Sequence, residues 1–146
     1  MIEADPGDLG LRLFAADRAV IVTEPSAWAV DGVEQILRNI GRIADRRQGA
    51  LTLAGIVVNR LARTRDARYW DAQLVDAHPE FVVRPAIAHK AAIAEASAQS
   101  LPITGVTRTG AAEAAAQFEL VLDAILSSPT AVHSEDHRDG VADAAV

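Results

Sequence analysis

The sequence predicts an α/β protein whose mostly parallel sheet lies between two layers of helices. Three nearly continuous apolar runs, at residues 19–23, 51–59 and 81–83, are typical of strands buried on both faces of a parallel sheet. Segments with helical periodicity separate these runs, and strands that alternate with helices pair in parallel through right-handed crossovers. Half of the residues are hydrophobic but only 4% are aromatic, so the core is predicted to be aliphatic.

Length and composition narrow the class of protein. A chain of 146 residues suits one domain, and the absence of cysteine excludes a disulfide framework and thiolate metal sites. No apolar run reaches the roughly 18–20 residues of a membrane span, and the acidic N-terminus lacks the apolar segment of a signal peptide. We therefore expect a soluble cytoplasmic protein, and we assign no metal ligands. The net charge of −6 does not indicate a nucleic-acid-binding surface, which is usually basic.

Turn-forming and helix-capping residues predict the elements around the first strand. A proline and two glycines predict that the first ten residues form a loop. After the strand at 19–23, Ser26 is the expected N-cap of an amphipathic helix that ends near residue 46. Trp28 and Trp70 are expected to pack against neighbouring elements.

The rest of the chain continues the alternation. Gly55, inside the second strand, predicts a bend or a close approach of another segment. The remaining predicted helices cover residues 68–77, 89–100 and 110–126. Residues 127–146 are polar and acidic and are predicted to be a disordered tail. Three strands are few for a doubly wound domain, so we expect part of a larger sheet.

Five ordered segments carry a resemblance to a known family. They are ADRAVIV at 16–22, EPS at 24–26 with V-x-G at 30–32, GIVVNR at 55–60, P-x-I at 85–87 with AIAEA at 92–96 and PI at 102–103, and R-x-GAA at 108–112. In this order and spacing they resemble the second half of the ParA/MinD family of deviant-Walker ATPases. The resemblance covers about three quarters of the chain.

The resemblance implies a partial P-loop NTPase domain. Residues 1–126 correspond to the C-terminal half of a ParA-like ATPase, and residues 1–14 to a remnant of its Walker B segment. There the family carries an aspartate that serves magnesium and water. With the glycines matched, Ala4 stands at that position and Asp5 lies one residue later, so no catalytic residue is assigned.

The same resemblance implies cofactors and partners. Family members use ATP and magnesium, dimerise with ATP, bind DNA non-specifically and respond to a ParB-like partner protein. The family's phosphate-binding loop precedes the matched region, and no G-x-x-x-x-G-K-[ST] pattern occurs in these 146 residues. Because triphosphate binding needs such a loop, we expect this chain alone neither to hold nor to cleave ATP well.

The candidate base-binding residues follow predicted strands. Asn59 ends the second strand, at the sheet edge where open α/β proteins bind ligands, and its amide can pair with N6 and N7 of adenine. The resemblance places Asn59 against the base, with Arg60 beside it and the loop containing Pro85 and Ile87 supplying backbone contacts. The alternatives are an asparagine that satisfies a turn and a solvated loop arginine.

Arg84 and Arg108 occupy segments through which relatives contact DNA. Phosphate contact needs only positive charge at the surface, so both are candidate DNA-binding residues. The alternative is that they are ordinary solvated charges.

The sequence thus predicts a ParA-like partitioning or positioning ATPase that lacks its phosphate loop. A second hypothesis is a non-enzymatic module that pairs with a separate chain or with itself through an exposed sheet edge. A third is the product of a damaged gene with no function of its own.

Overall fold

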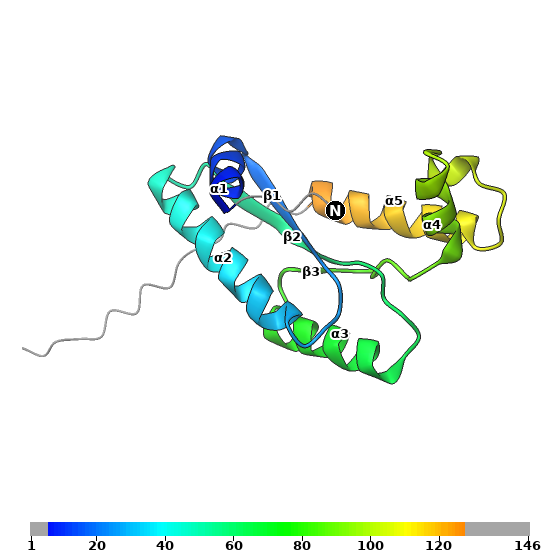
Figure 1. The fold of residues 1–146 in the computed structure, drawn as a ribbon. Coiled ribbons are helices and arrows are strands. Elements are labelled where there is room, and N and C mark those ends of the chain that lie inside the picture. Colours follow the sequence, from blue (N-terminus) through cyan, green and yellow to red (C-terminus); the bar gives the residue numbers. More distant parts are fainter. Residues whose placement is uncertain (1–5, 128–146) are drawn as a thin grey trace, which may run out of the picture.

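A computed structural model describes residues 6–127 of the chain. Its elements are α1 (Pro6–Ala15), β1 (Arg18–Thr23), α2 (Ala29–Arg46), β2 (Thr52–Val58), α3 (Arg65–Ala77), β3 (Val82–Val83), α4 (Ala91–Ala98), the 3₁₀ turn η1 (Ile103–Gly105) and α5 (Ala111–Ser127). The strands form one sheet in the order β1-β2-β3, and both pairings are parallel (Figure 1). The predicted α/β class with a parallel sheet is confirmed. The tail predicted after Ser127 lies outside the described residues.

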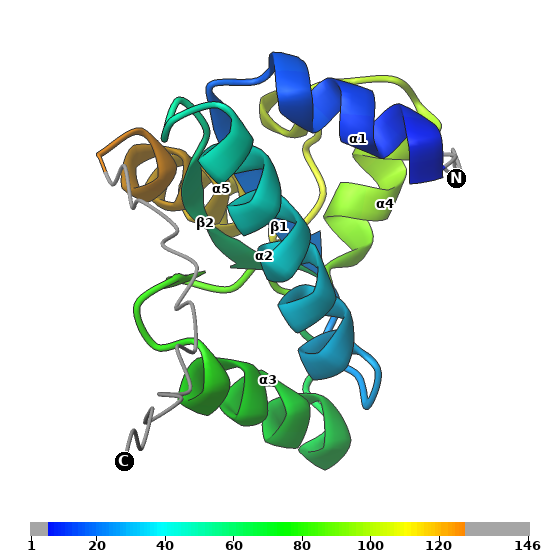
Figure 2. The same ribbon diagram turned by 90° about the vertical axis from the view of Figure 1, so that its left-hand side faces the viewer.

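One face of the sheet is covered by α2. Side chains that alternate along β1 and β2 point to this face and pack against the apolar stripe of α2. The helix α3 lies beside α2 (Figure 2). The largest of these side chains are fully buried: Val33, Ile40, Leu53, Ile56, Val58 and Leu74. All are aliphatic, as the low aromatic content predicts.

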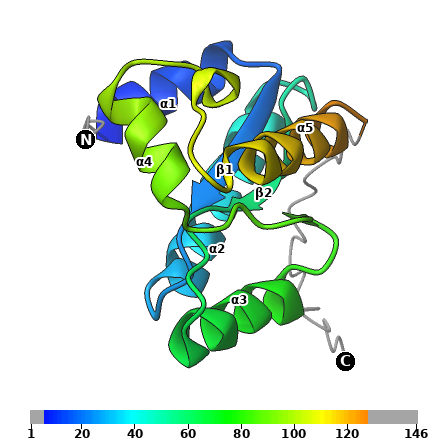
Figure 3. The same ribbon diagram turned by 90° about the vertical axis from the view of Figure 1, so that its right-hand side faces the viewer.

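The opposite face is covered by α5, which comes from the end of the described chain (Figure 3). Val121 of α5 packs there against Val57 of β2 and against Ile87, which follows β3. Beside it, α4 and η1 pack on the first turn of α5 through small side chains such as Ala92 and Ala111. The sheet therefore lies between two helical layers, and the second layer is centred on β2 and β3.

The prediction that β1 is buried on both faces is wrong. Ala19 and Ile21 are buried, but Val20 and Val22, which point to the α5 face, are 41% and 62% exposed. The physical reason is position: β1 is an edge strand, and α5 does not extend over it. An apolar run predicts a strand, but it does not predict which strand lies at the edge.

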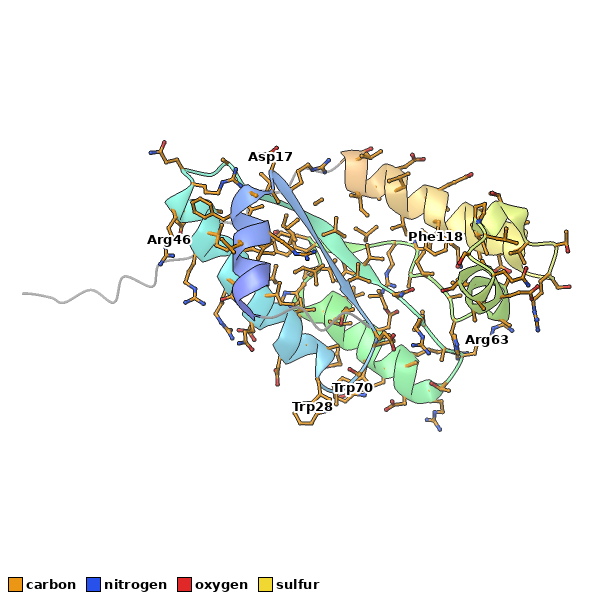
Figure 4. All side chains as sticks on the ribbon, turned by 45° about the horizontal axis from the view of Figure 1, so that its top comes forward. Asp17, Trp28, Arg46, Arg63, Trp70 and Phe118 are labelled. Atoms are coloured by element: carbon orange, nitrogen blue, oxygen red, sulfur yellow. The ribbon has the colours of Figure 1, made fainter. Side chains whose placement is uncertain are left out.

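Three further expectations about the N-terminal third are corrected. Residues from Pro6 onward form a helix, because proline fits the first helical position, where no N–H partner is needed. Ser26 is not the N-cap: α2 begins at Ala29, and Ser26 contributes only its carbonyl, to the Ala29 N–H at 3.0 Å. Trp28 does not pack, since it is 83% exposed at the start of α2 with its ring directed outward (Figure 4).

The expectation for Gly55 is confirmed. A Cβ at this position would lie 2.4 Å from Cγ2 of Val83, so only glycine lets β2 and β3 approach this closely. The β1–β2 register also shifts next to it, between Ala19 and Val20. This tight core of the sheet holds the carboxyl ends of β2 and β3 together.

Candidate functional site

The carboxyl ends of the strands are joined by a short hydrogen-bonded ladder. The Asn59 N–H donates to the Thr23 carbonyl at 2.8 Å, which links β2 to β1. The Ile87 N–H donates to the Val58 carbonyl, and the Leu61 N–H donates to the Ile87 carbonyl, each at 2.9 Å. The segment after β3 is thereby held against the segment after β2. Ligands bind at this edge in open α/β sheets.

A pocket of about 490 Å³ opens at this edge. Its volume lies within the range of small-molecule sites, roughly 300–1,000 Å³. It is lined by Asn59, Arg60, Ala88, His89, Lys90, Ile93, Ala94, Ser97 and Ala98. One side comes from the end of β2, and the other from the start and one face of α4. Apolar and polar side chains are mixed along this lining.

Asn59 and Arg60, both predicted as site residues, come together in this pocket. Within residues 6–127 no hydrogen bond engages the Asn59 side-chain amide, although its backbone N–H is bonded. Arg60 adopts a left-handed backbone with φ of 55°, which is uncommon for a residue with a side chain. Its guanidinium pairs with Glu24 at 3.2 Å, and both side chains are more than half exposed. The amide of Asn59 thus has free hydrogen-bonding capacity toward a ligand.

Pro85 and Ile87 do not line the pocket. The Ile87 side chain is buried against Val57 and Val121, and both its backbone N–H and its carbonyl are already hydrogen-bonded within the sheet. Pro85 lies in the segment that leads from β3 back to the carboxyl edge. Ala88, His89 and Lys90, the next residues along, are the ones that face the pocket from this segment.

Lys90 is the only lysine of the chain, and its charge is offset inside the site. Its side chain is mostly buried, and its ammonium donates to the Glu113 carboxylate of α5 at 2.7 Å. The hydrogen bond and the positive charge of Lys90 lower the pKa of Glu113, so this carboxylate is ionised at neutral pH. Because this lysine already has a carboxylate partner, it adds little net positive charge to the pocket.

The residues that α4 contributes were not predicted as site residues. Lys90, Ala94 and Ser97 recur at intervals of three and four positions, which places them on one face of a helix. Applied to the helix that follows Ile87, that spacing could have identified them from the sequence.

Arg84 and Arg108, the predicted DNA-binding residues, both hold carboxylates. Arg84 makes a two-pronged contact with Asp71 of α3, at 3.0 and 3.1 Å. Arg108 pairs with Glu95 of α4 at 2.9 Å. Each guanidinium would have to exchange its carboxylate for a phosphate, so neither is an unpaired positive charge.

The described part of the chain contains neither a candidate metal site nor a membrane-spanning helix. No cluster of three or more histidine or acidic side chains able to hold a metal occurs between residues 6 and 127. Asp5 lies outside the described residues. Over the same range, no helix has the length and apolarity to cross a bilayer.

Comparison with known proteins finds similarity both in sequence and in structure. The chain is 26% identical over 121 residues to the protein IncC of Escherichia coli, which covers 82% of this chain and 33% of IncC. Apo McdA from Cyanothece superposes with a TM-score of 0.63 at 21% identity, over 77% of this chain and 46% of McdA. A McdA variant in complex with ATP gives a TM-score of 0.62 at 22% identity, over 77% of this chain and 44% of that protein. No protein-family model matches the sequence.

These comparisons agree with the motifs quoted above. The sequence match to IncC and the shared fold with McdA cover most of this chain, yet the chain spans less than half the length of either protein. The chain is therefore a distant relative of the ParA/MinD family of ATPases, matched over about four fifths of its own length.

Proposed function

We propose that the pocket binds the adenine base of a nucleotide, and that the chain is the base-binding half of a ParA-like partitioning or positioning ATPase. The observation that carries this proposal is the Asn59 amide, which lies in a pocket at the carboxyl edge of a parallel sheet with no hydrogen-bond partner in the described structure. An asparagine amide offers one donor and one acceptor that match N7 and N6 of adenine.

The proposal assigns the remaining lining residues simple roles. The apolar wall of Ala88, Ile93 and Ala94 would contact the flat faces of the base, and Arg60 would border its exposed side. Arg60 is available for this because its present partner, Glu24, is a solvent-exposed carboxylate whose pairing is weak.

The residues present do not fit a triphosphate with magnesium. Phosphates are held by glycine-rich loops, helix N-termini and free cations. No glycine lines this pocket, and its two cations, Arg60 and Lys90, are paired with Glu24 and Glu113. No group of metal-ligating side chains occurs among residues 6–127. We therefore propose no hydrolytic step for this chain alone. ATP hydrolysis would need phosphate-binding elements that the 146 residues do not contain.

Partners are proposed only for a complete ParA-like ATPase that contains this chain. Such a protein would bind a ParB-like partner protein and non-specific DNA, and it would be cytoplasmic. Arg84 and Arg108 would contribute to DNA binding only after releasing Asp71 and Glu95.

The base-binding proposal is tested by titrating the isotope-labelled chain with AMP and following its backbone amide resonances. We expect saturable shifts at Asn59, Arg60 and Lys90, with GMP binding weaker on the order of tenfold, because a bidentate contact discriminates bases by roughly 1–3 kcal/mol. Asn59→Ala should weaken AMP binding by a similar factor. Asn39→Ala, a matched change on α2 where Asn39 contacts only Arg42 among the hydrogen bonds described, should leave AMP binding unchanged. Shifts confined to other surfaces, or equal binding by the two variants, would contradict the proposal.

A further inference from the structure

The open side of the molecule is the edge of β1. Within the described residues β1 pairs only with β2, so the backbone groups along its other edge face outward. Natural edge strands are commonly protected by proline, by lysine or by charges directed inward. The segment Ala19-Val20-Ile21-Val22 contains none of these, and it is strongly β-forming. This edge is therefore a template for another strand.

Both faces of the edge are apolar. On the α5 face, Val20 and Val22 are exposed. On the α2 face, a groove of about 270 Å³ lies beside the end of β1. Its apolar lining includes Ile21, Trp28 just before α2, and Ile36 of α2, next to the polar residues Thr23, Glu24 and Ser26. A strand added at this edge would bury apolar side chains above and below the sheet, which an ordinary solvated edge would not offer.

The flank of α5 extends the apolar surface of that face. On one flank of α5, Glu113 and Gln117 contact Lys90 and Ala88, next to β3. Phe118, Leu122 and Leu126 recur every four residues on the other flank, and all three are exposed. Arg18 of β1 donates to the Ile125 carbonyl, which ties this end of α5 to β1. The exposed α5 flank thus lies on the side of α5 away from β3, and the end of this helix is linked to β1.

The sequence of the edge is complementary to itself when reversed. About Ile21 as centre, Val20 matches Val22, the small Ala19 matches Thr23, and Arg18 at one end matches Glu24 of opposite charge at the other. An antiparallel partner with the same sequence would place each valine opposite a valine and each Arg18 opposite a Glu24. Directly opposite residues of an antiparallel pair share one face of the sheet and interact.

We propose that two copies of this chain associate through antiparallel pairing of their β1 edges, around a two-fold axis that passes between the two Ile21 residues. This pairing joins the two sheets into one sheet of six strands, because each copy contributes three strands. Four valines meet on one face, bordered by both α5 flanks. Two Arg18–Glu24 pairs close the ends of the ladder. The association goes beyond base binding and does not depend on a nucleotide.

Sedimentation velocity of the full chain over a range of protein concentrations tests the proposal. We expect a reversible dimer in the absence of nucleotide. Val22→Lys should weaken it by about 100-fold, because two valines leave the interface and two charges enter it. Leu120→Lys is the matched control: Leu120 is 57% exposed, against 62% for Val22, and it lies three residues from Gln117 on the flank that faces away from β1. This variant should dimerise as the natural chain does.

A charge exchange tests the register itself. Arg18→Glu and Glu24→Arg each replace two attractive cross-strand pairs with two repulsive ones, and each should weaken the dimer on the order of tenfold. The double variant R18E/E24R restores opposite charges and should recover most of the affinity, although its contacts with Ile125 and Arg60 inside each copy are lost. Recovery would not occur at an interface elsewhere, or at one formed by unspecific apolar contact.

Three outcomes would overturn the proposal. They are a monomer at all concentrations, a dimer that Val22→Lys does not weaken, and a double charge variant that is no better than either single one. A monomer would leave the edge to a strand of a different polypeptide. None of these results bears on AMP binding, so the failure of this proposal and the failure of the base-binding proposal are distinguishable.

Discussion

The two faces of β1 have very different surroundings. Ala19 and Ile21 are buried beneath α2, the helix that follows the strand directly in the sequence. Val20 and Val22, on the other face, remain exposed because α5 lies over β2 and β3 only. Local connectivity completes one layer of the fold, whereas the other layer depends on a distant helix that stops short of the edge. The covered face stabilises the carboxyl edge that forms the pocket, and the open face offers an interaction surface.

The largest effect is expected from truncating one side chain on each face. Ile56→Ala on the α2 face should cost about 2–5 kcal/mol of unfolding free energy, because the side chain is fully buried. Val22→Ala on the open face should cost less than about 0.5 kcal/mol in dilute solution. Urea denaturation measures both. If β1 pairs with itself, the cost of Val22→Ala should grow with protein concentration, since dimerisation stabilises the folded chain. A cost as large as that of Ile56→Ala in dilute protein would mean that the open face is covered.

Adding a methyl group should have different effects on the covered and the open part of the α5 face. Gly55→Ala would place a methyl group against Val83, and we expect a loss of about 1–3 kcal/mol from overpacking. Val83→Ala in the same chain should recover part of that loss by making room. Val22→Ile, which adds a methyl group on the open half, should change the free energy of unfolding by less than about 0.5 kcal/mol. Equal effects of the two single changes in chemical denaturation would remove the contrast.

The two edges of the sheet also differ. At the β3 side, Arg84 fastens the chain to α3 through Asp71, whereas the described β1 edge has no neighbouring strand. A double-mutant cycle with Arg84→Ala and Asp71→Ala should give a coupling of about 0.5–1 kcal/mol, modest because Arg84 is partly exposed. A coupling near zero would mean that Arg84 is free in solution to contact other anions.

The smallest expected effect is a pH dependence beside the covered face. His78 ends α3, and burial lowers the pKa of its imidazole below the usual 6.5, partly opposed by the nearby carboxylate of Glu34. The unfolded chain therefore binds a proton more readily than the folded chain does. The contribution of neutral His78 to the free energy of unfolding should be fully present above pH 6.5. It should fall as the pH drops from there toward the lowered pKa. His78→Leu should flatten this window in thermal melts. Glu113→Gln should not, because its lowered pKa lies below 4.5.

Most of the architecture could be predicted from the periodicity of hydrophobic residues and from the positions of turn-forming residues. The apolar runs identified the strands, and Gly55 predicted the close approach of β3. The exposure of Val20 and Val22 could not be predicted, because it depends on how far α5 extends over a strand much earlier in the sequence. Local pattern carries no information on such a distance. The start of α1 was missed because proline followed by glycine also marks turns.

The lining of the pocket could be predicted in part. Asn59 and Arg60 could be found because they end a recognisable strand. That Ile87 does not line the pocket could not be predicted, since an isolated residue after a two-residue strand gives no sign of which backbone groups the sheet will use. To predict the lining residues of α4, one must know which face of this helix points to the pocket. The Ala-rich composition gives no polar–apolar pattern that would identify that face.

The most direct test of the account compares AMP, ADP and ATP with magnesium by isothermal titration of the full chain. If the chain holds the base and not the phosphates, the three affinities should agree within about threefold, because the paired Lys90 offers little attraction to added charge. Binding of ATP with magnesium 100-fold tighter than binding of AMP would contradict the central claim, since it would require a phosphate site in these 146 residues.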